Sequence, residues 1–183
     1  MNGDGGAGQT ADGSADAPDN DGHRFDRLPA TAEERVVPDR ATRAEVLAWW
    51  EERFGVEPAV FEAYTFWERG NGKVWALRGT EPTPAEIEAL GLTLLRTRRE
   101  HWKPTLSAVQ RFGGHATRNV VHLSEEGAAA FFAGEDQDVA WDGDWGYLIV
   151  THDLAGEPEP LGVGLYVHGE LRSQVPKGRR REL

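Results

Sequence analysis

Hydrophobic residues in the first part of the chain recur with the period of an α-helix and then follow a hairpin pattern. Between Asp39 and Phe54 they fall on one side of a helix, which Thr42 and Glu45 can open as a capping box. Two β-rich runs, at 60–69 and 73–78, then flank Gly70-Asn71-Gly72, and Asn-Gly between such runs is typical of a tight hairpin. Periodicity and residue type predict an aromatic core for this part: Trp49, Trp50, Phe54, Phe61, Phe66, Trp67 and Trp75.

Shorter elements follow. A Thr83-x-x-Glu86 pattern predicts a short helix to Leu90, and the last forty residues contain strands joined by a turn at His168-Gly169, because Gly tolerates positive φ. The remaining pattern predicts strands at 92–99, 118–123 and 145–151, and helices at 103–112 (begun by Pro104) and 124–133. Trp145 and Tyr147 are expected to pack inside, and Asp153 in His152-Asp153 to start a turn. Interspersed helices and strands without a Gly-rich phosphate loop predict an α+β fold.

Residues 1–36 differ from the rest in composition. The first thirty are rich in Asp and Gly with few aliphatic residues, so they offer too little apolar surface to offset the entropy of ordering. We therefore predict a disordered acidic tail. The chain contains no cysteine, no secretory h-region and no apolar run long enough to span a membrane, so we expect a cytoplasmic protein with no membrane partner.

Charge is distributed unevenly. The chain has 31 acidic and 20 basic residues, a net charge of −11, and arginine far outnumbers lysine. This acid-rich, lysine-poor composition resembles that of cytosolic proteins from salt-loving archaea. Eleven of the twenty bases nevertheless fall in residues 91–122 and 172–183, which together contain two acids, Glu100 and Glu182. These segments can form a basic footprint for nucleic acid, or their arginines can pair with the acidic surface.

Two short motifs near the end of the chain carry a family resemblance. Pro160-Leu161-Gly162-x-Gly164 precedes the last hairpin, and Pro176-Lys177-Gly178-Arg179 follows it. The segment resembles the PUA-like RNA-binding domain at the C-terminus of the NOL1/NOP2/Sun rRNA cytosine-C5 methyltransferases and, more loosely, NIP7-like proteins. The resemblance implies an α+β chain with a helix/hairpin pre-PUA-like module at 37–95 and a PUA-like mixed β pseudo-barrel at 96–183. Leu165 and Val175 depart from the family, which often has a basic residue and an aromatic residue there.

Catalysis is not expected. Cytosine-C5 transfer needs a thiolate nucleophile, and the chain has no cysteine and no Gly-rich loop for a methyl donor. We therefore predict no catalytic residues and no cofactor. A zinc site built from His115, His122, His152 and Asp153 is conceivable from residue type, but no spacing indicates it, so no metal is predicted.

The predicted RNA-binding residues are the bases of the two basic segments: Arg96, Arg98, Arg99, Lys103, Arg111, Arg118, Arg172, Lys177, Arg179, Arg180 and Arg181. Stacking on a base is considered for Trp102, Phe112 and Tyr166, although the core is the more common place for the first two. The family motif implies structural roles for Gly162, Gly164 and Gly178, and phosphate contacts for Lys177 and Arg179.

Together these features predict a non-catalytic RNA-binding protein of rRNA or tRNA modification or ribosome biogenesis. An alternative is an adaptor that docks an RNA-modification enzyme, such as a methyltransferase, or a ribosome-assembly protein through the same surface. An enzyme with a compact pocket ranks last. Both the RNA-binding and the adaptor hypothesis assume that arginines distant in the sequence meet on one surface of the fold.

Overall fold

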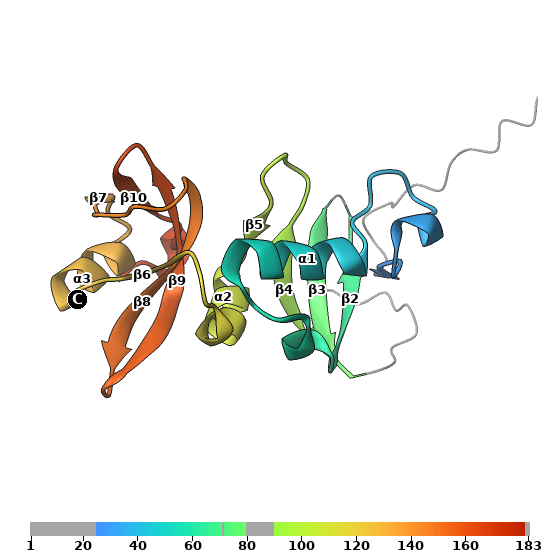
Figure 1. Cartoon of the computed structure of the whole chain (residues 1–183), viewed down its shortest axis with the longest axis horizontal. Coiled ribbons are helices and arrows are strands. Elements are labelled where there is room, and N and C mark those ends of the chain that lie inside the picture. Colours follow the sequence, from blue (N-terminus) through green and yellow to red (C-terminus); the bar gives the residue numbers. More distant parts are fainter. Residues whose placement is uncertain (1–24, 71, 80–89, 182–183) are drawn as a thin grey trace, which may run out of the picture.

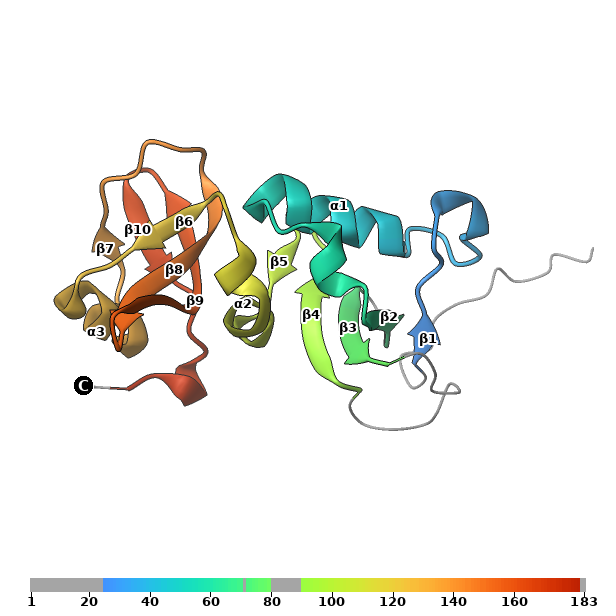
Figure 2. The same cartoon turned by 60° about the horizontal axis from the view of Figure 1, so that its bottom comes forward.

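The computed structural model describes residues 25–70, 72–79 and 90–181. Two five-stranded sheets lie one after the other along the long axis, with α2 between them (Figures 1 and 2). The strand order is β1-β2-β3-β4-β5 in the first sheet and β6-β8-β9-β10-β7 in the second. This confirms the α+β class and the mixed, curled second sheet expected of a PUA-like pseudo-barrel.

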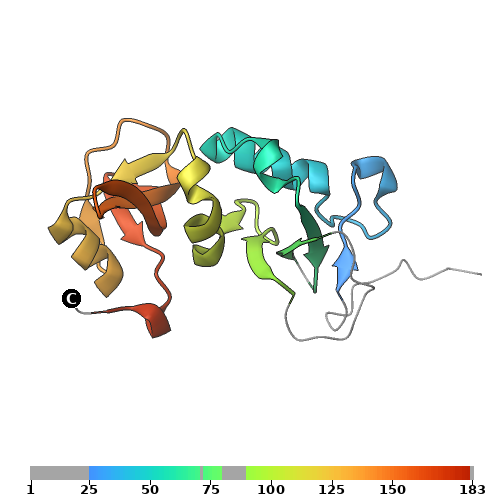
Figure 3. The ribbon, with the colours of Figure 1, turned by 90° about the horizontal axis from the view of Figure 1, so that it is seen from below.

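The first sheet is antiparallel throughout, and α1 covers one of its faces (Figure 3). Its strands are β1 (Asp26–Arg27), β2 (Tyr64–Glu68), β3 (Lys73–Arg78), β4 (Leu92–Arg96) and β5 (Lys103–Pro104). The helical elements are α1 (Arg43–Phe54) and the short 3-10 turns η1 (Ala32–Glu34) and η2 (Pro58–Phe61).

Helix α1 begins and ends as its sequence predicts. The Thr42 side chain accepts a hydrogen bond from the Glu45 amide, and the Glu45 carboxylate accepts one from the Thr42 amide, which completes a capping box. Gly55 takes the left-handed conformation at the C-terminal end (φ 64°). Trp50 and Phe54 of this helix are fully buried, as predicted, whereas Trp49, also predicted in the core, is only half-buried.

The second sheet combines one parallel pair, β6 with β8, with antiparallel pairs elsewhere. Its strands are β6 (Val120–His122), β7 (Gln137–Asp138), β8 (Gly146–Leu154), β9 (Glu157–Val167) and β10 (Glu170–Ser173). The helical elements are α2 (Leu106–Phe112), η3 (Gly113–His115), α3 (Glu125–Ala133) and η4 (Lys177–Arg179). The turn at His168-Gly169 is confirmed, with positive φ at both residues (55° and 91°).

Several predicted boundaries were wrong. Pro104 does not begin a helix; it ends β5, and Thr105 caps α2 instead. The strand at 145–151 continues to Leu154, because β9 remains paired with it, so the turn falls at Ala155-Gly156 and not at His152-Asp153. Residues 60–63 form part of a 3-10 turn and its exit rather than a strand.

Part of the predicted tail is ordered. Within residues 25–36, Phe25 and Leu28 are 1% and 5% exposed, and β1 pairs with β2. Phe25 packs edge-on against Trp75 at 5.5 Å between ring centroids, and this aromatic contact supplies the apolar burial that composition alone did not suggest. The helix predicted at Thr83 lies outside the described residues.

The two sheets share a hydrophobic core. One cluster of buried residues contains Trp50 and Leu94 from the first half together with Ile149 and Val163 from the second. A separate cluster around Phe131 and Leu148 lies between α3 and the second sheet. The pairing of β5 with β4 places residues 103–104 in the first sheet. The domain boundary between residues 95 and 96 stays a prediction.

Candidate nucleic-acid interface

Four of the predicted RNA-binding residues lie together at one end of the first sheet. Arg96 ends β4 and pairs in register with Lys103 of β5, while Arg98 and Arg99 are exposed in the loop between the two strands. No ion pair joins any of these four to a carboxylate in the described parts of the chain. The β4–β5 loop and the strand ends beside it therefore present four cations without an ion-pair partner, with Glu100 as the one acidic residue among residues 96–103.

Electrostatics at Lys103 reflect this crowding. Partial burial lowers the pKa of its ammonium group below the usual value, and the nearby charges of Arg96 and Arg99 lower the pKa further. Lys103 Nζ also lies 5.8 Å from the centroid of the Tyr147 ring. An anion bound here would relieve the repulsion between the three cations.

A hydrogen bond connects this loop with the segment leading to the basic tail. Lys103 Nζ donates to Gln174 Oε1 at 2.6 Å. Gln174 precedes Lys177 by three residues, a separation of at most about 10 Å even in fully extended chain. Lys177 and Arg179 are exposed in η4. The structure thus brings parts of the two basic segments, far apart in sequence, near one another.

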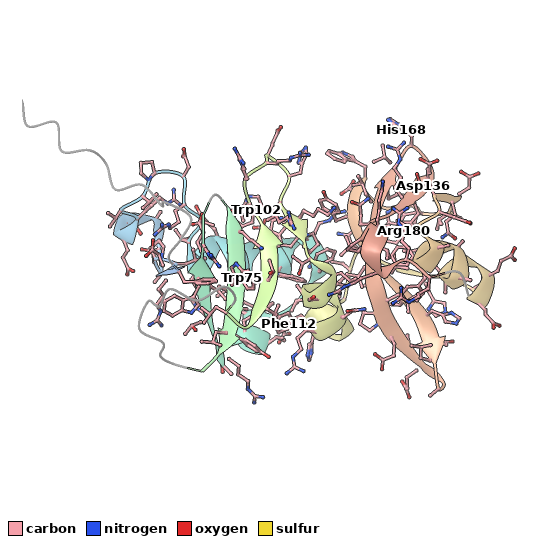
Figure 4. All side chains as sticks on the ribbon, turned by 180° about the vertical axis from the view of Figure 1, so that it is seen from behind. Trp75, Trp102, Phe112, Asp136, His168 and Arg180 are labelled. Atoms are coloured by element: carbon pink, nitrogen blue, oxygen red, sulfur yellow. The ribbon has the colours of Figure 1, made fainter. Side chains whose placement is uncertain are left out.

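Residues 180–181 lie against α3. The Arg180 side chain packs against Gly134, at the end of that helix, and its Nε donates to the Val175 carbonyl at 3.3 Å. The Arg181 amide donates to the Phe132 carbonyl at 3.1 Å. Figure 4 shows Arg180 over the second sheet and Trp102 over the first. These contacts fix the direction of residues 180–181, although both residues remain exposed overall.

Three predicted cations lie apart from this group. Arg111 donates to the Tyr64 hydroxyl at 3.2 Å, at the end of the first sheet opposite Arg96. Arg118 lies beside the C-terminal end of α1, and Arg172 is ion-paired with Glu170 at 2.6 Å. The arginines of the two segments therefore do not form one continuous surface, and RNA contact by these three stays a prediction.

The three aromatic residues considered for stacking on a base have different surroundings. Phe112 is 2% exposed and packs against Phe61 at 4.7 Å between centroids, so its ring faces are not available to a base and its place is in the core. Trp102 is half-buried and tilted against Trp49 at 6.4 Å. Tyr166 is half-buried, and its hydroxyl donates to the Trp141 carbonyl.

The motif glycines also differ. A Cβ at Gly162 would come within 2.6 Å of Leu106, and one at Gly164 within 2.4 Å of Leu171. Both are sites of close packing beneath β9, as the family motif implies. A Cβ at Gly178 would meet nothing within 4 Å, so packing does not require this glycine.

The sequence did not predict a cavity of about 750 Å³ between the two halves of the molecule. It is lined by residues of α1, of the β4–β5 loop, of the start of β8 with the two residues before it, and of β9: Glu45, Ala48, Trp49, Glu52, Arg53, Glu100, His101, Trp102, Asp144, Trp145, Gly146, Tyr147, Leu165 and Val167. Trp145 was expected to pack inside, but it is 59% exposed because it precedes β8 and faces this cavity. Its place beside Asp142-Gly143-Asp144 was the signal in the sequence, since such residues are typical of exposed turns.

Polar contacts fix the floor of this cavity. Arg53 donates to the Tyr147 carbonyl at 2.8 and 3.0 Å and to the Trp145 carbonyl at 3.4 Å. Burial lowers the pKa of Arg53, and the charge of Asp144 opposes that change. Burial likewise raises the pKa of Tyr147. A side chain at Gly146 (φ 124°) would collide with the Arg53 guanidinium, so glycine is needed there.

The histidines in the described residues do not form a metal site with their neighbours. His122 stacks on His152 at 6.1 Å, and His122 Nε2 lies 3.8 Å from Asp153. Within residues 25–70, 72–79 and 90–181, no group of three His, Cys, Asp or Glu side chains could hold a metal ion. Over the same residues, no helix has the length and hydropathy needed to cross a membrane.

In comparison with known proteins, the two parts of the chain match different family models. Residues 118–181 match the family model of the PUA domain of the methyltransferase RsmF. This part of the chain is a PUA-like domain. Residues 11–91 match a family of unknown function, DUF7122. A search of curated proteins found no match. The PUA-like domain supports RNA binding in a methyltransferase-related context, whereas NIP7-like kinship stays a prediction.

Proposed function

We propose that the chain is a non-catalytic RNA-binding protein that acts in the modification or maturation of rRNA or tRNA. The observation that carries the proposal is the match of residues 118–181 to the PUA domain of the methyltransferase RsmF. The unpaired cations at the β4–β5 loop support a surface that binds the RNA backbone. The Lys103–Gln174 hydrogen bond connects this loop with the segment that precedes the basic tail.

Phosphate recognition suits the residues at this surface. Arginine binds phosphate oxygens through two parallel N–H donors, and lysine acts as a point charge. Arg98 and Arg99 are exposed in the loop, while Lys103 is held by its neighbours. Contacts of this kind position a strand without reading its sequence, so structured or single-stranded RNA would be recognised mainly by shape and backbone.

RNA binding can be tested in a salt series with a mixed rRNA and tRNA pool. The logarithm of affinity should fall linearly with the logarithm of salt, at about 0.7 per phosphate neutralised. The double variant Arg98→Ser/Arg99→Ser should bind at least about tenfold more weakly, with a slope shallower by about 1.4.

A matched control removes two exposed cations from the other part of the first sheet. Arg27→Ser/Arg78→Ser makes the same change in net charge, and both residues are exposed away from the β4–β5 loop. This control should keep the parent slope. Equal losses in the two variants would show diffuse attraction, and parent-like binding by Arg98→Ser/Arg99→Ser would exclude the proposed surface.

The tail is tested separately. Lys177→Ser/Arg179→Ser leaves Arg180 and its packing against Gly134 intact. We expect a second loss of about tenfold, together with a shallower salt slope, if the tail contacts phosphate. The same affinity and slope as the parent would restrict the interface to the loop.

The absence of catalysis is part of the proposal. The chain contains no cysteine that could attack cytosine C6. Incubation with rRNA and isotopically labelled S-adenosylmethionine should therefore transfer no label above a protein-free control. Transfer that saturates with RNA would overturn this part of the proposal without affecting RNA binding.

A further inference from the structure

The cavity between α1 and the β4–β5 loop has aromatic walls. Trp49 and Trp102 lie at 6.4 Å between centroids with a 35° tilt, and the exposed Trp145 meets His101 edge-on at 5.0 Å. Its volume of about 750 Å³ falls in the range of sites that bind small molecules, so it has ample room for one long side chain. An exposed indole beside other aromatic rings is costly to leave without a partner, since it keeps a large apolar surface in water.

Carboxylates surround these walls. Glu52, Glu100 and Asp144 line the cavity, and none of the three has an ion-pair partner within 4 Å in the described part of the chain. Glu45, which also lines the cavity, is paired with Arg35 at 2.6 Å. The cation at the floor, Arg53, directs its donors to backbone carbonyls. The charged lining groups that form neither an ion pair nor a hydrogen bond to backbone are therefore acidic, and of these Asp144 also lies close enough to Arg53 to raise its pKa.

We propose that this cavity binds an arginine side chain of a protein partner. A guanidinium is planar and stacks on indole faces, and its fork of donors matches a carboxylate in two parallel hydrogen bonds. The cavity offers both kinds of partner at once, with Trp102 and Trp145 as aromatic surfaces and Glu100 and Asp144 as acceptors. An ammonium group forms no planar stack, so lysine fits less well.

RNA is a poorer occupant. A base could stack on the indoles, but its phosphates would then lie beside the carboxylates of Glu52, Glu100 and Asp144. The proposal does not depend on RNA binding by the β4–β5 loop, because Arg98 and Arg99 do not line the cavity.

Nuclear magnetic resonance of the whole chain provides the test. The probe is a blocked pentapeptide with one central arginine, titrated to millimolar concentration while the indole N–H signals of Trp49, Trp102 and Trp145 are followed. These three signals should shift together. The same peptide with citrulline, which keeps the shape and loses the charge, should bind at least about fivefold more weakly, and so should the lysine peptide.

Two variants locate the site. Trp145→Ala removes an exposed ring, and Glu100→Gln/Asp144→Asn removes two charges. Each variant should bind the arginine peptide at least about fivefold more weakly than the parent does. The matched controls, Leu154→Ala and Glu157→Gln/Glu159→Gln, change exposed residues near the β8–β9 turn and should bind as the parent does.

Each competing outcome would overturn the proposal. Equal binding of the citrulline peptide would mean that charge is irrelevant. Stronger shifts with adenosine or uridine monophosphate would assign the cavity to a nucleobase, and tighter binding of spermidine would assign it to a free amine. By contrast, loss of RNA binding in Arg98→Ser/Arg99→Ser with intact peptide binding is the result that the proposal expects, because Arg98 and Arg99 do not line the cavity.

Discussion

At the residue scale, glycines of similar motifs have different physical roles. Gly164 lies in β9 where Leu171 and Val150 pack against its backbone, and Gly178 lies in η4 with open space around it. Close packing around Gly164 leaves no room for a methyl group. The family motif by itself therefore does not say which of the two glycines is needed for stability.

This difference predicts opposite results for the same substitution. Gly164→Ala should lower the free energy of unfolding by about 1–3 kcal/mol, because the new methyl group collides with Leu171. Gly178→Ala should change it by less than about 0.5 kcal/mol. Urea unfolding followed by circular dichroism measures both, and similar values for the two variants would contradict the packing described for β9.

The charge state of Lys103 is a second property of a single residue. Its pKa is lowered by burial first and by Arg96 and Arg99 next, so the folded chain binds fewer protons here than the unfolded chain does. Between that lowered pKa and the usual value, stability therefore rises with pH. The penalty for the charged form is fully present at lower pH.

Removing one neighbouring charge should move the pKa of Lys103 in a defined direction. In Arg99→Ser the pKa should rise toward its usual value, whereas Arg78→Ser, which changes an exposed arginine of β3, should leave it unchanged. A pH titration of the Lys103 side-chain resonances measures this. An unchanged or lower value in Arg99→Ser would contradict the crowding of cations at the β4–β5 loop.

At the element scale, α2 joins the two sheets. It packs against β4 on one side and β9 on the other, and Thr105 starts it. The Thr105 hydroxyl donates to the Thr93 carbonyl and accepts from the Ala108 amide at 3.1 Å. This one side chain therefore ties the beginning of α2 to β4 and satisfies a free amide of the helix.

Loss of the Thr105 hydroxyl should weaken the attachment of α2 to the first sheet. Thr105→Ala should destabilise the fold by about 0.5–2 kcal/mol in chemical unfolding. Ser107→Ala is the control within the same first turn, because no described contact uses the Ser107 hydroxyl, and its effect should stay within about 0.5 kcal/mol. Equal destabilisation by the two would indicate helix propensity rather than capping.

At the scale of the whole molecule, the shared core predicts cooperative unfolding. Five of the seven tryptophans precede residue 118, so tryptophan fluorescence reports chiefly on the first half. Ile149 belongs to the second sheet but is fully buried in the cluster that contains Trp50 and Leu94. Ile149→Ala should therefore lower the free energy of unfolding, as measured by tryptophan fluorescence, by about 2–5 kcal/mol.

The comparison substitution is Leu171→Ala, which removes a buried side chain from the second cluster. Cooperative unfolding requires that this variant also shift the tryptophan transition, and that circular dichroism give the same midpoint. Two separated transitions, or a fluorescence signal insensitive to either variant, would show that the halves unfold independently.

Local rules were sufficient wherever an element is specified by neighbours in the sequence. The capping box at Thr42, the left-handed Gly55 and the turn at His168-Gly169 were predictable because each depends on a few adjacent residues. The buried aromatic face of α1 followed from its 3.6-residue period. The Pro160–Gly164 and Pro176–Arg179 motifs likewise sufficed to indicate a PUA-like domain, which the family match confirms.

Contacts between distant segments decided the rest. The separation of Arg111 and Arg118 from the β4–β5 loop, the burial of Phe112 and the exposure of Trp145 depend on how the two halves meet. The aromatic cavity depends on the same meeting, since four separate segments line it. Sequence fixes periodicity, caps and charge within each segment, whereas distances between segments arise only when buried surfaces pack together.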